Sequence, residues 1–395
     1  MKVFAYLPSY LSSGGSGVNE RKLLEHLTSN AFSLVFTVNR ENKTVSLSEL
    51  MPVCRKRTKI IPFSRWAKPA FIFDIFFAML LSLSLVFHRL MGGDRYDVIY
   101  VRSASEAIGF SFLKKLHGVP VVLKLMSFRS DEYFMCESKT ILHECIRYFL
   151  FQLEKVATLS SQAIIAPSLL FKKELICKFN VLESKISTLG VGVDLNFFDN
   201  AKDDVSSSGS TFTIGYVGSL IPLNDLSTLL KALKVVNSTV KTKLLILTRD
   251  DSSNLKKDIF AQNLSSLVKI ESVPHNEVPT YMSRMDIIII PRRRLSSTEL
   301  VLPLKLFEAG ASRRPIIIAR TRLIEEMLTD NVDVVMYTPE DSVDLAQKIV
   351  MLSMDKSLRN CLSINLFEFV KYYDWQKVAL IFQNILTKIS SMAKK

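Results

Sequence analysis

The segment PLKLFEAGASRRP, residues 303–315, has the pattern of a buried helix but carries Lys305 and Glu308 inside it. Side chains three residues apart lie on the same face of a helix, so these two charges are expected to be neighbours. Charged side chains are rarely buried unless they are paired or bind something. The segment therefore predicts either a buried structural pair or a helix that presents two charges to a ligand.

Three glycines, Gly14, Gly15 and Gly17, directly precede another helical pattern, VNERKLLEHLTS. Because glycine has no Cβ, a phosphate can approach the backbone N–H groups of such a loop, and the start of a helix favours an anion. The loop therefore predicts a phosphate contact. A short glycine-rich surface loop has the same composition.

Arginines follow two apolar runs that are typical of strands. Arg292, Arg293 and Arg294 come directly after DIIIIP, and Arg249 comes after LLILT. In parallel α/β sheets, ligands bind at the carboxyl ends of the strands. The arginines are therefore candidates for contacts to an anionic ligand, whereas three adjacent arginines are also typical of a solvated basic turn.

The elements that must position these residues alternate between strands and helices. The predicted strands are KVFAYL, FSLVFTV, YDVIYV, VPVVLKLM and SQAIIAPS in the first half, and FTIGYVG, TKLLILT, VKIESV, DIIIIP, RPIIIA and VDVVMYT in the second. Between the halves, residues 199–212 break the pattern with charge, serine and glycine, as a domain linker does. Strands that alternate with helices form parallel sheets with right-handed crossovers. The sequence therefore predicts an α/β protein with two successive parallel sheets.

The composition favours a cytoplasmic protein with anionic partners. The 395 residues include 51 Lys and Arg against 38 Asp and Glu, which gives a net charge of +13 and suits phosphates or acidic lipid headgroups. Zinc-finger spacings and the aromatic, glycine and basic pattern of RNA-binding proteins do not occur, which argues against nucleic acid. The five cysteines are scattered, and the N-terminal stretch is too weakly apolar for a signal peptide, so we expect a reducing compartment and no structural metal.

Residues 70–87, AFIFDIFFAMLLSLSLVF, are apolar except for Asp74 and two serines. Three placements agree with this composition: a helix that spans a bilayer, a helix among lipid headgroups, and a helix buried in the N-terminal domain. Basic residues on both sides favour the headgroup region over a bilayer-spanning position. The phenylalanines do not share one narrow face, which argues against an ordinary half-exposed surface helix.

Five segments together resemble the GT-B glycosyltransferases, and within them the large retaining group called family 4. They are GGSGVNERKLLEHL, the serine-ended strand and following segment IIAPSLLFKKELICKFNVLESKISTLGVGVDLNFF, the strand and helix GYVGSLIPLNDLSTLLKALKVV, the glutamate-bearing helix PLKLFEAGASRRPIIIA, and the closing YYDWQKVALIFQNIL. Each segment alone is a weak signal, but the five occur in the family's order and spacing over nearly the whole chain.

The resemblance implies two Rossmann-like domains that face each other across a cleft. We expect an acceptor-binding domain over residues 1–200, a linker over 201–210, a nucleotide-sugar donor domain over 211–370, and a C-terminal helix, 371–395, that packs back on the first domain. The nucleotide sugar is then a substrate, and no cofactor is expected. No metal is expected either, because side chains and helix N-termini would stabilise the diphosphate, and no DxD-type metal motif occurs.

The resemblance also assigns roles to single residues. Glu308 matches the family's second glutamate, which accepts hydrogen bonds from hydroxyl groups of the donor, and Glu299 is the nearby candidate for the first, one residue out of register. Gly218 matches the glycine that ends the opening strand of the donor domain. The family commonly has an arginine and a lysine after it, but this chain has Ser219 and Asn224 at those positions.

Two cations expected at the donor diphosphate are therefore missing. Charge develops on the leaving diphosphate during transfer, so other cations must stabilise it. Lys305 and the arginines that follow the strands, Arg249 and Arg292 to Arg294, are the candidates to replace them.

The acceptor side departs from the family as well. Many relatives have a histidine after the strand that matches VPVVLKL, where this chain has MSFRSDEY. Ser127, Arg129, Asp131 and Glu132 are the candidates for acceptor contacts.

The sequence thus predicts a metal-independent, hexosyltransferase-type enzyme that transfers a sugar with retention. The donor is a nucleotide sugar, and the acceptor is a lipid-linked or cell-surface glycan reached from the cytoplasmic face of the membrane, where the protein is peripheral. Ser219, Asn224 and the missing histidine motivate an alternative, a GT-B pseudoenzyme that acts as a binding or scaffold subunit of a glycan-assembly complex. A soluble transferase with a small-molecule acceptor is a third interpretation.

Overall fold

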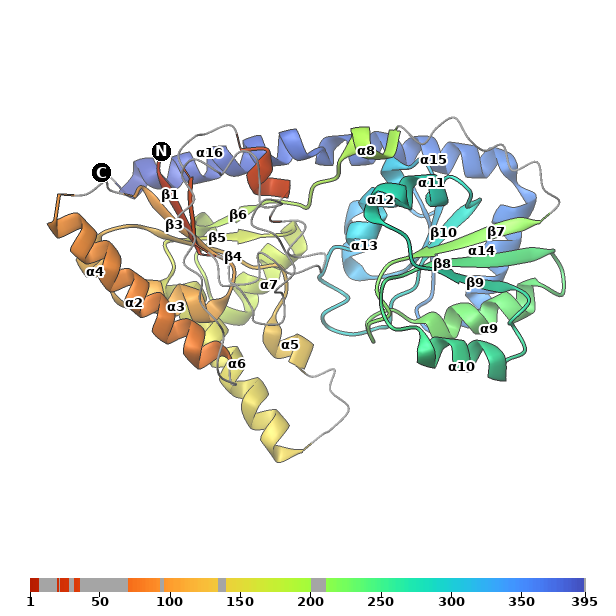
Figure 1. The fold of residues 1–395 in the computed structure, drawn as a ribbon, viewed down its shortest axis with the longest axis horizontal. Helices are drawn as coiled ribbons and strands as arrows, with labels where there is room; N and C mark the ends of the chain where they lie inside the picture. The colour runs from red at the N-terminus through yellow and green to blue at the C-terminus, as the bar shows by residue number, and fades with distance from the viewer. Residues whose placement is uncertain are drawn as a thin grey trace. The chain divides into compact units, whose positions relative to one another are not determined.

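The computed structural model describes residues 1–6, 20, 22–27, 32–35, 70–92, 96–133, 140–199 and 211–393. The chain divides into two compact units, an N-terminal unit of residues 1–192 with 375–395 and a C-terminal unit of residues 193–374. Each unit contains one six-stranded sheet between helices (Figure 1). The predicted α/β architecture with two parallel sheets is confirmed.

The N-terminal sheet has the strand order β2-β1-β3-β4-β5-β6, and all neighbouring strands are parallel. Its strands are β1 (Val3–Tyr6), β2 (Phe32–Val35), β3 (Val98–Val101), β4 (Val121–Lys124), β5 (Ala163–Ala166) and β6 (Ile186–Thr188). The helices of this unit include α2 (Ala70–Leu90), α3 (Ala104–Phe112), α4 (Lys114–His117), α5 (Arg129–Tyr133), α6 (Ile141–Ser160), α7 (Leu169–Phe179) and α16 (Trp375–Ala393).

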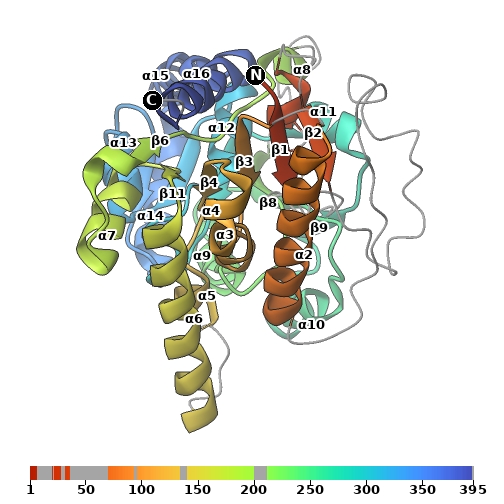
Figure 2. The ribbon, with the colours of Figure 1, turned by 90° about the vertical axis from the view of Figure 1, so that its left-hand side faces the viewer.

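The two faces of the N-terminal sheet pack against different helices, because side chains alternate along a strand. On one face, the rings of Phe4 and Tyr6 in β1 contact Phe110 of α3, and Tyr6 also contacts Phe77 of α2. On the other face, the helical residues 22–25 and α16 share a core cluster with the strands. The C-terminal helix therefore packs on the N-terminal unit (Figure 2).

Helix α2 is half exposed, so the argument against a half-exposed helix over residues 70–87 is wrong, and the placement among lipid headgroups stays a prediction. Asp74 is buried on the side where α2 packs against α3, and its charge adds to the burial that raises the pKa of Glu106 to about 7. Phe76 and Phe87, in contrast, are 59% and 65% exposed. The helix carries apolar residues on all of its sides, so their spacing in the sequence does not indicate which face is buried. Within the described residues, no helix is long and apolar enough to cross a membrane.

The C-terminal sheet has the strand order β12-β11-β10-β7-β8-β9 and is also parallel. Its strands are β7 (Phe212–Val217), β8 (Thr242–Leu247), β9 (Val268–Glu271), β10 (Ile287–Ile290), β11 (Ile316–Ala319) and β12 (Val335–Tyr337). Its helices are α8 (Leu195–Asp199), α9 (Leu226–Val236), α10 (Ser253–Ala261), α11 (Val278–Met282), α12 (Leu304–Ala311), α13 (Arg322–Met327), α14 (Ser342–Met354) and α15 (Lys356–Val370).

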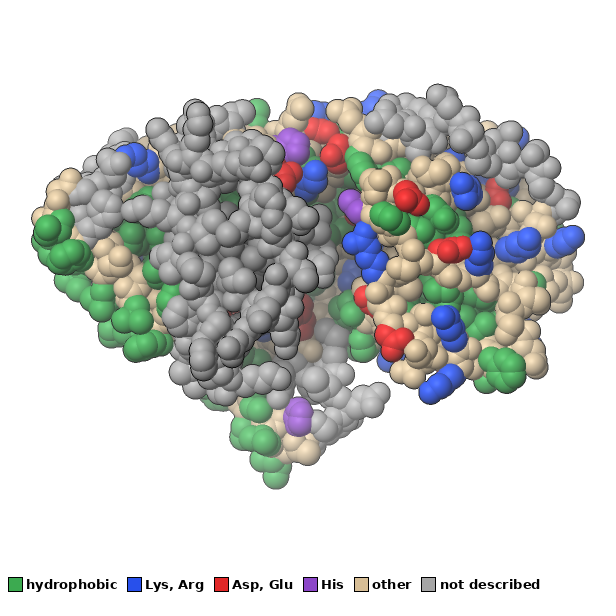
Figure 3. Space-filling view, in the orientation of Figure 1, with side chains coloured by type: hydrophobic (Ala, Val, Ile, Leu, Met, Phe, Trp, Pro, Cys, Tyr) green, Lys and Arg blue, Asp and Glu red, His purple; other side chains and the backbone are tan. Residues whose placement is uncertain are grey.

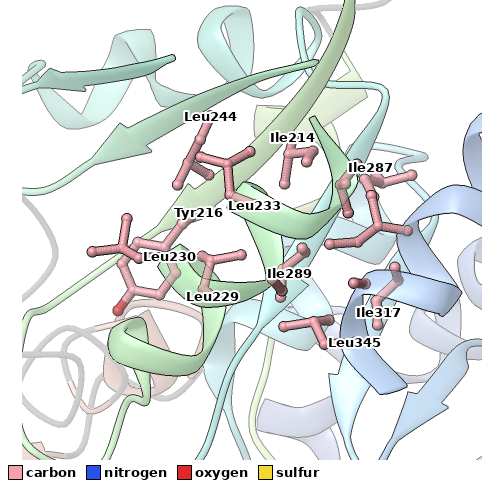
Figure 4. Close-up of a cluster of buried hydrophobic side chains, with 14 of the residues drawn as sticks. Ile214, Tyr216, Leu229, Leu230, Leu233, Leu244, Ile287, Ile289, Ile317 and Leu345 are labelled. Carbon is pink, nitrogen blue, oxygen red and sulfur yellow. The ribbon is translucent and has the colours of Figure 1, made fainter. Parts of the chain in front are cut away.

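One face of this sheet forms a dense apolar core with α9 and α14. Leu229 and Leu233 of α9 lie against Ile214 and Tyr216 of β7, and Leu345 of α14 belongs to the same cluster (Figure 4). Along the chain, the apolar strands alternate with amphipathic helices, and these helices cover the sheet. Residues of β7 and β10 both belong to this core, and the loops that follow these two strands carry most of the predicted site.

The C-terminal unit begins at Val193, earlier than the predicted end of the first domain. The Val193 N–H donates to the Tyr373 carbonyl at 2.8 Å, and the ring of Phe197 in α8 stacks on His275 with centroids 4.9 Å apart. These contacts attach the segment around α8 to the C-terminal unit, although no change in composition marks the boundary. The predicted linker, residues 201–210, lies outside the described residues.

Candidate ligand site at the C-terminal sheet

The C-terminal sheet has a topological switch point between β7 and β10. From β7 the chain first builds β8 and β9 on one side, and it then returns to build β10, β11 and β12 on the other. At such a point the loops after the two adjacent strands diverge and leave a crevice where ligands bind. Two of the predicted groups, the residues after β7 and the arginines after β10, both lie at this point.

The loops after β7 and β10 are joined through their backbones. Asn224 and Arg292 form an isolated antiparallel bridge, and the Arg293 N–H donates to the Leu223 carbonyl at 3.1 Å. Residues that are almost seventy positions apart in the sequence, by 292 minus 224, are therefore neighbours.

The loop after β7 satisfies its own polar groups. The Ser219 carbonyl accepts hydrogen bonds from the Tyr216 hydroxyl and from the Asn224 side-chain amide, the latter at 2.9 Å. The Leu220 N–H donates to Asp250 at 2.6 Å. Asn224 thus stabilises the loop, and positions 219 and 224 offer no positive charge to a ligand.

Helix α12 places Lys305 directly over this loop. Lys305 Nζ donates to the Tyr216 hydroxyl at 3.0 Å and lies 4.5 Å from the centre of the Tyr216 ring. A Cβ at position 218 would lie 1.9 Å from Lys305 Cε, and Gly218 has a φ of 138°, which side chains rarely allow. The backbone therefore requires glycine at position 218, and a side chain there would also displace the flexible end of Lys305.

Lys305 is partly buried, and among the described residues no anionic group contacts its ammonium. Loss of hydration, together with the charge of Arg292, lowers the pKa of Lys305 to about 7, and the charges of Glu308 and Asp250 oppose this shift only in part. Within the described residues its ammonium makes one hydrogen bond, to neutral Tyr216, although an ammonium can donate three. Lys305 therefore keeps donor capacity for a further group.

Glu308 follows Lys305 by one helical turn and is also partly buried. Loss of hydration raises the pKa of Glu308 to about 7, against the opposing charge of Lys305. In the part of the chain that the structure describes, its carboxylate has no hydrogen bond or ion pair. Lys305 and Glu308 are thus not a closed structural ion pair, and both keep hydrogen-bonding capacity.

The three arginines after β10 have different environments. Arg292 is buried, its Nη1 donates to the Val301 carbonyl at 2.6 Å, and burial lowers its pKa to about 10. Arg293 and Arg294 are exposed. The interpretation as a solvated basic turn therefore fits Arg293 and Arg294, whereas Arg292 belongs to the interior of the site.

Two further predicted residues have structural partners. Glu299 accepts a hydrogen bond at 2.7 Å from the N–H of Arg322, the first residue of α13, so it caps that helix. Arg249 is exposed, and its Nε donates to the Val273 carbonyl at 3.4 Å. The centre of the site is accordingly made of Lys305, Glu308 and Arg292. Among the described residues, no group of three or more His, Cys, Asp or Glu side chains could hold a metal ion.

In the N-terminal unit, the predicted acceptor residues lie in and just before α5. The N-terminus of α5 is held by buried Glu154, which accepts hydrogen bonds from the Arg129 N–H at 2.5 Å and from the Ser130 hydroxyl at 2.6 Å. Asp131 forms an ion pair with Lys178 at 2.7 Å. Asp131 therefore has a structural partner, Lys178. The sequence analysis did not identify Glu154, the buried carboxylate that holds the start of α5.

The other acceptor candidates have no such contact. Within the described residues, no hydrogen bond or ion pair involves the side chains of Ser127, Arg129 or Glu132. The predicted phosphate loop with Gly14, Gly15 and Gly17 lies outside the described residues.

A buried charge cluster in the N-terminal unit was also missed. Glu20 accepts hydrogen bonds from Lys124 Nζ at 2.6 Å and from the Tyr100 hydroxyl at 2.8 Å, and it lies 3.3 Å from Arg102 Nε. Burial alone would raise the pKa of Glu20, but the charges of Lys124 and Arg102 outweigh it, so the pKa lies below its ordinary value. The only signal in the sequence is a lysine inside the apolar strand VPVVLKLM.

Comparisons with known proteins agree with this geometry. Residues 211–355 match the family described as Glycosyl transferases group 1. An uncharacterised glycosyltransferase of Methanocaldococcus jannaschii is 23% identical over 245 residues, which cover 62% of this chain and 63% of that protein. The chain therefore aligns with less than two thirds of this relative.

Solved structures share the fold at low sequence identity. HepE of Anabaena, solved in complex with UDP and glucose, has a TM-score of 0.74 at 15% identity, over 98% of this chain and 100% of that one. Sucrose-phosphate synthase of Thermosynechococcus elongatus has a TM-score of 0.78 at 16% identity, over 99% of this chain and 100% of that one. The chain thus has the GT-B fold, and its residues 211–355 match the model of the group 1 glycosyltransferase family.

Proposed function

We propose that the protein is a glycosyltransferase that holds a nucleotide-sugar donor at the switch point of the C-terminal sheet. The observation that carries this proposal is the state of Lys305 and Glu308. One helix of a group 1 domain presents an ammonium that lacks an anion and a carboxylate that lacks donors. A nucleotide sugar offers both complements, a diphosphate and neighbouring hydroxyl groups.

The proposed reaction transfers a hexosyl group with retention and without a metal. The bond between the anomeric carbon and the diphosphate oxygen breaks, and a bond forms from that carbon to an acceptor hydroxyl oxygen, whose proton passes to the departing diphosphate. Negative charge develops on the diphosphate as it leaves, and Lys305 stabilises it there. Arg292, buried beside the same loop, adds positive potential, and Glu308 orients the donor through its hydroxyl groups.

A UDP-sugar is the first donor to test. HepE, which has the same fold, was solved with UDP and with UDP-glucose. The purified protein should show a thermal shift and slow hydrolysis with at least one sugar of a panel of UDP- and GDP-sugars. No response to any member would reject the enzyme, and binding without any turnover would favour the alternative of a pseudoenzyme in a glycan-assembly complex.

The proposed acceptor is a lipid-linked or cell-surface glycan at the cytoplasmic face of the membrane, with the protein bound peripherally. An exposed apolar stripe on α2 supports this, and hydrophobic side chains gather along α2 and at the end of α6 (Figure 3). The stripe consists of Phe76, Leu80, Leu83, Phe87 and Leu90. Exposed apolar surfaces of this kind bind membranes or proteins, and the net charge of +13 favours acidic lipids.

Sedimentation with vesicles tests the membrane contact. Vesicles that contain phosphatidylglycerol should retain the wild type and lose a variant with Phe76→Ser and Phe87→Ser. Phe260→Ser, at a position 76% exposed in α10 of the other unit, is the matched control and should bind like the wild type. Equal binding of all three proteins would exclude this surface.

A further inference from the structure

We propose that helix α6 is the interface of a homodimer, in which it pairs antiparallel with α6 of a second copy of this chain. This inference goes beyond the proposed function and does not depend on donor binding. Three features of α6 point to this partner: exposed apolar side chains, heptad spacing, and charges that match across a two-fold axis.

The outer face of α6 is exposed and largely apolar. The helix buries Glu154, Ala157 and Thr158 on its inner side, and its first half extends past α3 (Figure 1 and Figure 2). The exposed apolar side chains lie on the opposite side, with exposed fractions from 44% to 86%: Ile141, Leu142, Tyr148, Phe149, Val156 and Leu159. Exposed apolar surfaces of this kind mark interaction sites, so this face is expected to have a partner.

The residues of this face recur at the spacing of a coiled coil. Steps of three and four residues alternate through a row that we call the α6 seam: Leu142, Cys145, Phe149, Gln152, Val156 and Leu159. Cys145 is exposed like its apolar neighbours, and Gln152 is partly exposed. Alternating steps of this kind are the a and d positions with which one helix packs against another, and one polar residue in such a row favours a single register. The seam therefore predicts a helical partner.

The α6 seam is complementary to itself when two copies lie antiparallel. A two-fold axis between Leu150 and Phe151 places each a residue level with a d residue of the second copy. The level pairs are Leu142 with Leu159, Phe149 with Gln152, and Val156 with Cys145. The axis produces each contact twice, so this one surface is sufficient for a closed dimer.

The charges beside the seam match in the same arrangement. Glu144 and Lys155 are exposed and about three helical turns apart, so they lie on the same edge of α6. In the antiparallel pair, Lys155 lies within about 3 Å, along the helix axis, of the level of Glu144 of the second copy. A parallel pair would instead place like charges level with each other, which is unfavourable. The charges therefore favour the antiparallel dimer.

Area and charge favour a second copy over a membrane as the partner. The exposed apolar side chains can bury of the order of 600 Å² per copy, or about 1,200 Å² per dimer, which reaches the lower end of stable protein interfaces. Helices that lie on acidic lipid carry an excess of basic residues. Helix α6 has two acidic and two basic residues: Glu144, Glu154, Arg147 and Lys155. The dimer contact and the membrane contact proposed for α2 therefore involve different helices.

Sedimentation velocity of the full chain tests the dimer. At micromolar concentration the wild type should sediment with twice the mass of one chain. Phe149→Glu should raise the dissociation constant of the dimer by at least about thirtyfold, because it places a carboxylate inside the seam of both copies. Phe260→Glu, at a position 76% exposed in α10, is the matched control and should remain dimeric. Both replaced side chains are exposed, so both variants should fold, which circular dichroism verifies.

Disulfide trapping tests the antiparallel register. In a background whose other four cysteines are replaced by serine, Val156→Cys introduces a thiol level with Cys145 of the second copy. Oxidation should then give a covalent dimer on a non-reducing gel. With Cys145 alone, the two thiols are about 16 Å apart along the helix axis, which is too far for a disulfide. A covalent dimer through Cys145 alone would indicate a parallel pair and overturn the antiparallel arrangement.

Exchange of the two charges tests the edge contact. Glu144→Lys and Lys155→Glu should each raise the dissociation constant by about two- to tenfold, and the double variant should restore it. A double variant that is weaker than both single variants would overturn the register.

The outcomes also separate this inference from the proposed function. A wild type that stays monomeric, or a Phe149→Glu variant that dimerises like the wild type, would overturn the dimer. A monomeric wild type that binds phosphatidylglycerol vesicles, together with a Phe149→Glu variant that does not, would assign α6 to the membrane instead. Binding and turnover of UDP- and GDP-sugars remain the test of the glycosyltransferase proposal, whichever result is obtained here.

Discussion

Both units of this protein hold charged side chains largely withdrawn from solvent, but the two sets differ in their partners. In the N-terminal sheet, Glu20 contacts Lys124, Arg102 and Tyr100 near the ends of β3 and β4. In the C-terminal sheet, Lys305 has one hydrogen bond to a neutral hydroxyl and Glu308 has none among the described residues. Charges with partners stabilise the fold, whereas Lys305 and Glu308 keep hydrogen-bonding capacity for a further group.

The pKa shifts follow the same division. Partners bring the pKa of Glu20 below its ordinary value in spite of complete burial, whereas burial without partners raises the pKa of Glu308 to about 7. A buried charge without partners costs folding free energy, and proteins retain such charges mainly at functional sites. The pKa by itself does not mark a binding site, because Glu106 and Glu154 have hydrogen-bond partners and their pKa values are also raised to about 7. The open hydrogen-bonding capacity of Lys305 and Glu308 is what distinguishes the C-terminal site.

The largest expected effect is on the closed cluster. Glu20→Gln leaves the cations Lys124 and Arg102 buried without their shared carboxylate, which should lower the free energy of unfolding by about 3–5 kcal/mol. Urea denaturation measures this loss. Glu25→Gln, which breaks only the partly exposed pair with Lys22 at 3.5 Å, should change it by less than about 1 kcal/mol. Equal effects of the two substitutions would contradict the role of the cluster.

A smaller loss is expected at the turn that Lys305 crosses. Gly218→Ala should destabilise the protein by about 1–3 kcal/mol, because the backbone has a φ of 138° and the new Cβ would displace Lys305. It should also weaken donor binding. Gly92→Ala has a φ of 73°, close to the left-handed region, and no atom within 4 Å of the new Cβ, so its loss should be smaller than that of Gly218→Ala. If Lys305→Ala does not reduce the loss from Gly218→Ala, the lysine does not lie over the glycine.

The contribution of Glu308 to the free energy of unfolding should increase as the pH falls. The pKa of Glu308 is about 7 in the folded protein and about 4.3 when unfolded, so the folded state binds more protons between these values. Wild-type stability relative to Glu308→Gln should therefore rise as the pH falls from 7 to 4.5, by up to about 1.4 kcal/mol per pH unit. Urea titrations at several pH values measure this difference.

Glu20 should behave in the opposite way. Its pKa is lowered on folding, so its contribution is complete above pH about 4.3 and is lost as the pH falls through the folded value. If the difference in the free energy of unfolding between the wild type and Glu308→Gln stays constant from pH 7 to 4.5, Glu308 is ionised and paired. This result would remove the contrast between the two clusters.

The smallest effects are expected at the exposed arginines. Arg293→Ala and Arg294→Ala should each change stability by less than about 0.5 kcal/mol, because their side chains are exposed. Their effect on donor affinity should be at least about fivefold smaller than that of Arg292→Ala, whose guanidinium is buried at the loop. Equal losses of affinity for the three variants would place the ligand over the exposed turn instead.

Much of the fold could be predicted from local pattern. Apolar runs with alternating helices were enough for two parallel sheets, because strand and helix periodicity are properties of neighbouring residues. Ser168, the last residue of SQAIIAPS, is of a type that caps helices, and its hydroxyl accepts a hydrogen bond from the Phe171 N–H at 3.0 Å. The position of Lys305 and Glu308 on one helical face followed from their spacing alone.

Contacts between distant segments decided the rest. Spacing could not separate buried Arg292 from exposed Arg293 and Arg294, because their burial depends on a loop that approaches from β7. The sequence made Glu299 a candidate ligand residue, but in the structure its carboxylate accepts a hydrogen bond from the N–H of Arg322, the first residue of α13. Buried and exposed faces of α2 likewise depend on where α3 packs.

Local sequence was therefore sufficient for the elements, for the strand ends at which we propose the ligand site, and for the charged face of α12. Tertiary structure alone decided which charges are closed and which are open. The Glu20 cluster joins residues from three separate segments, up to 104 positions apart, and Lys305 meets Tyr216 across 89. Hydration and charge compensation depend on these long-range neighbours, and no local periodicity records them.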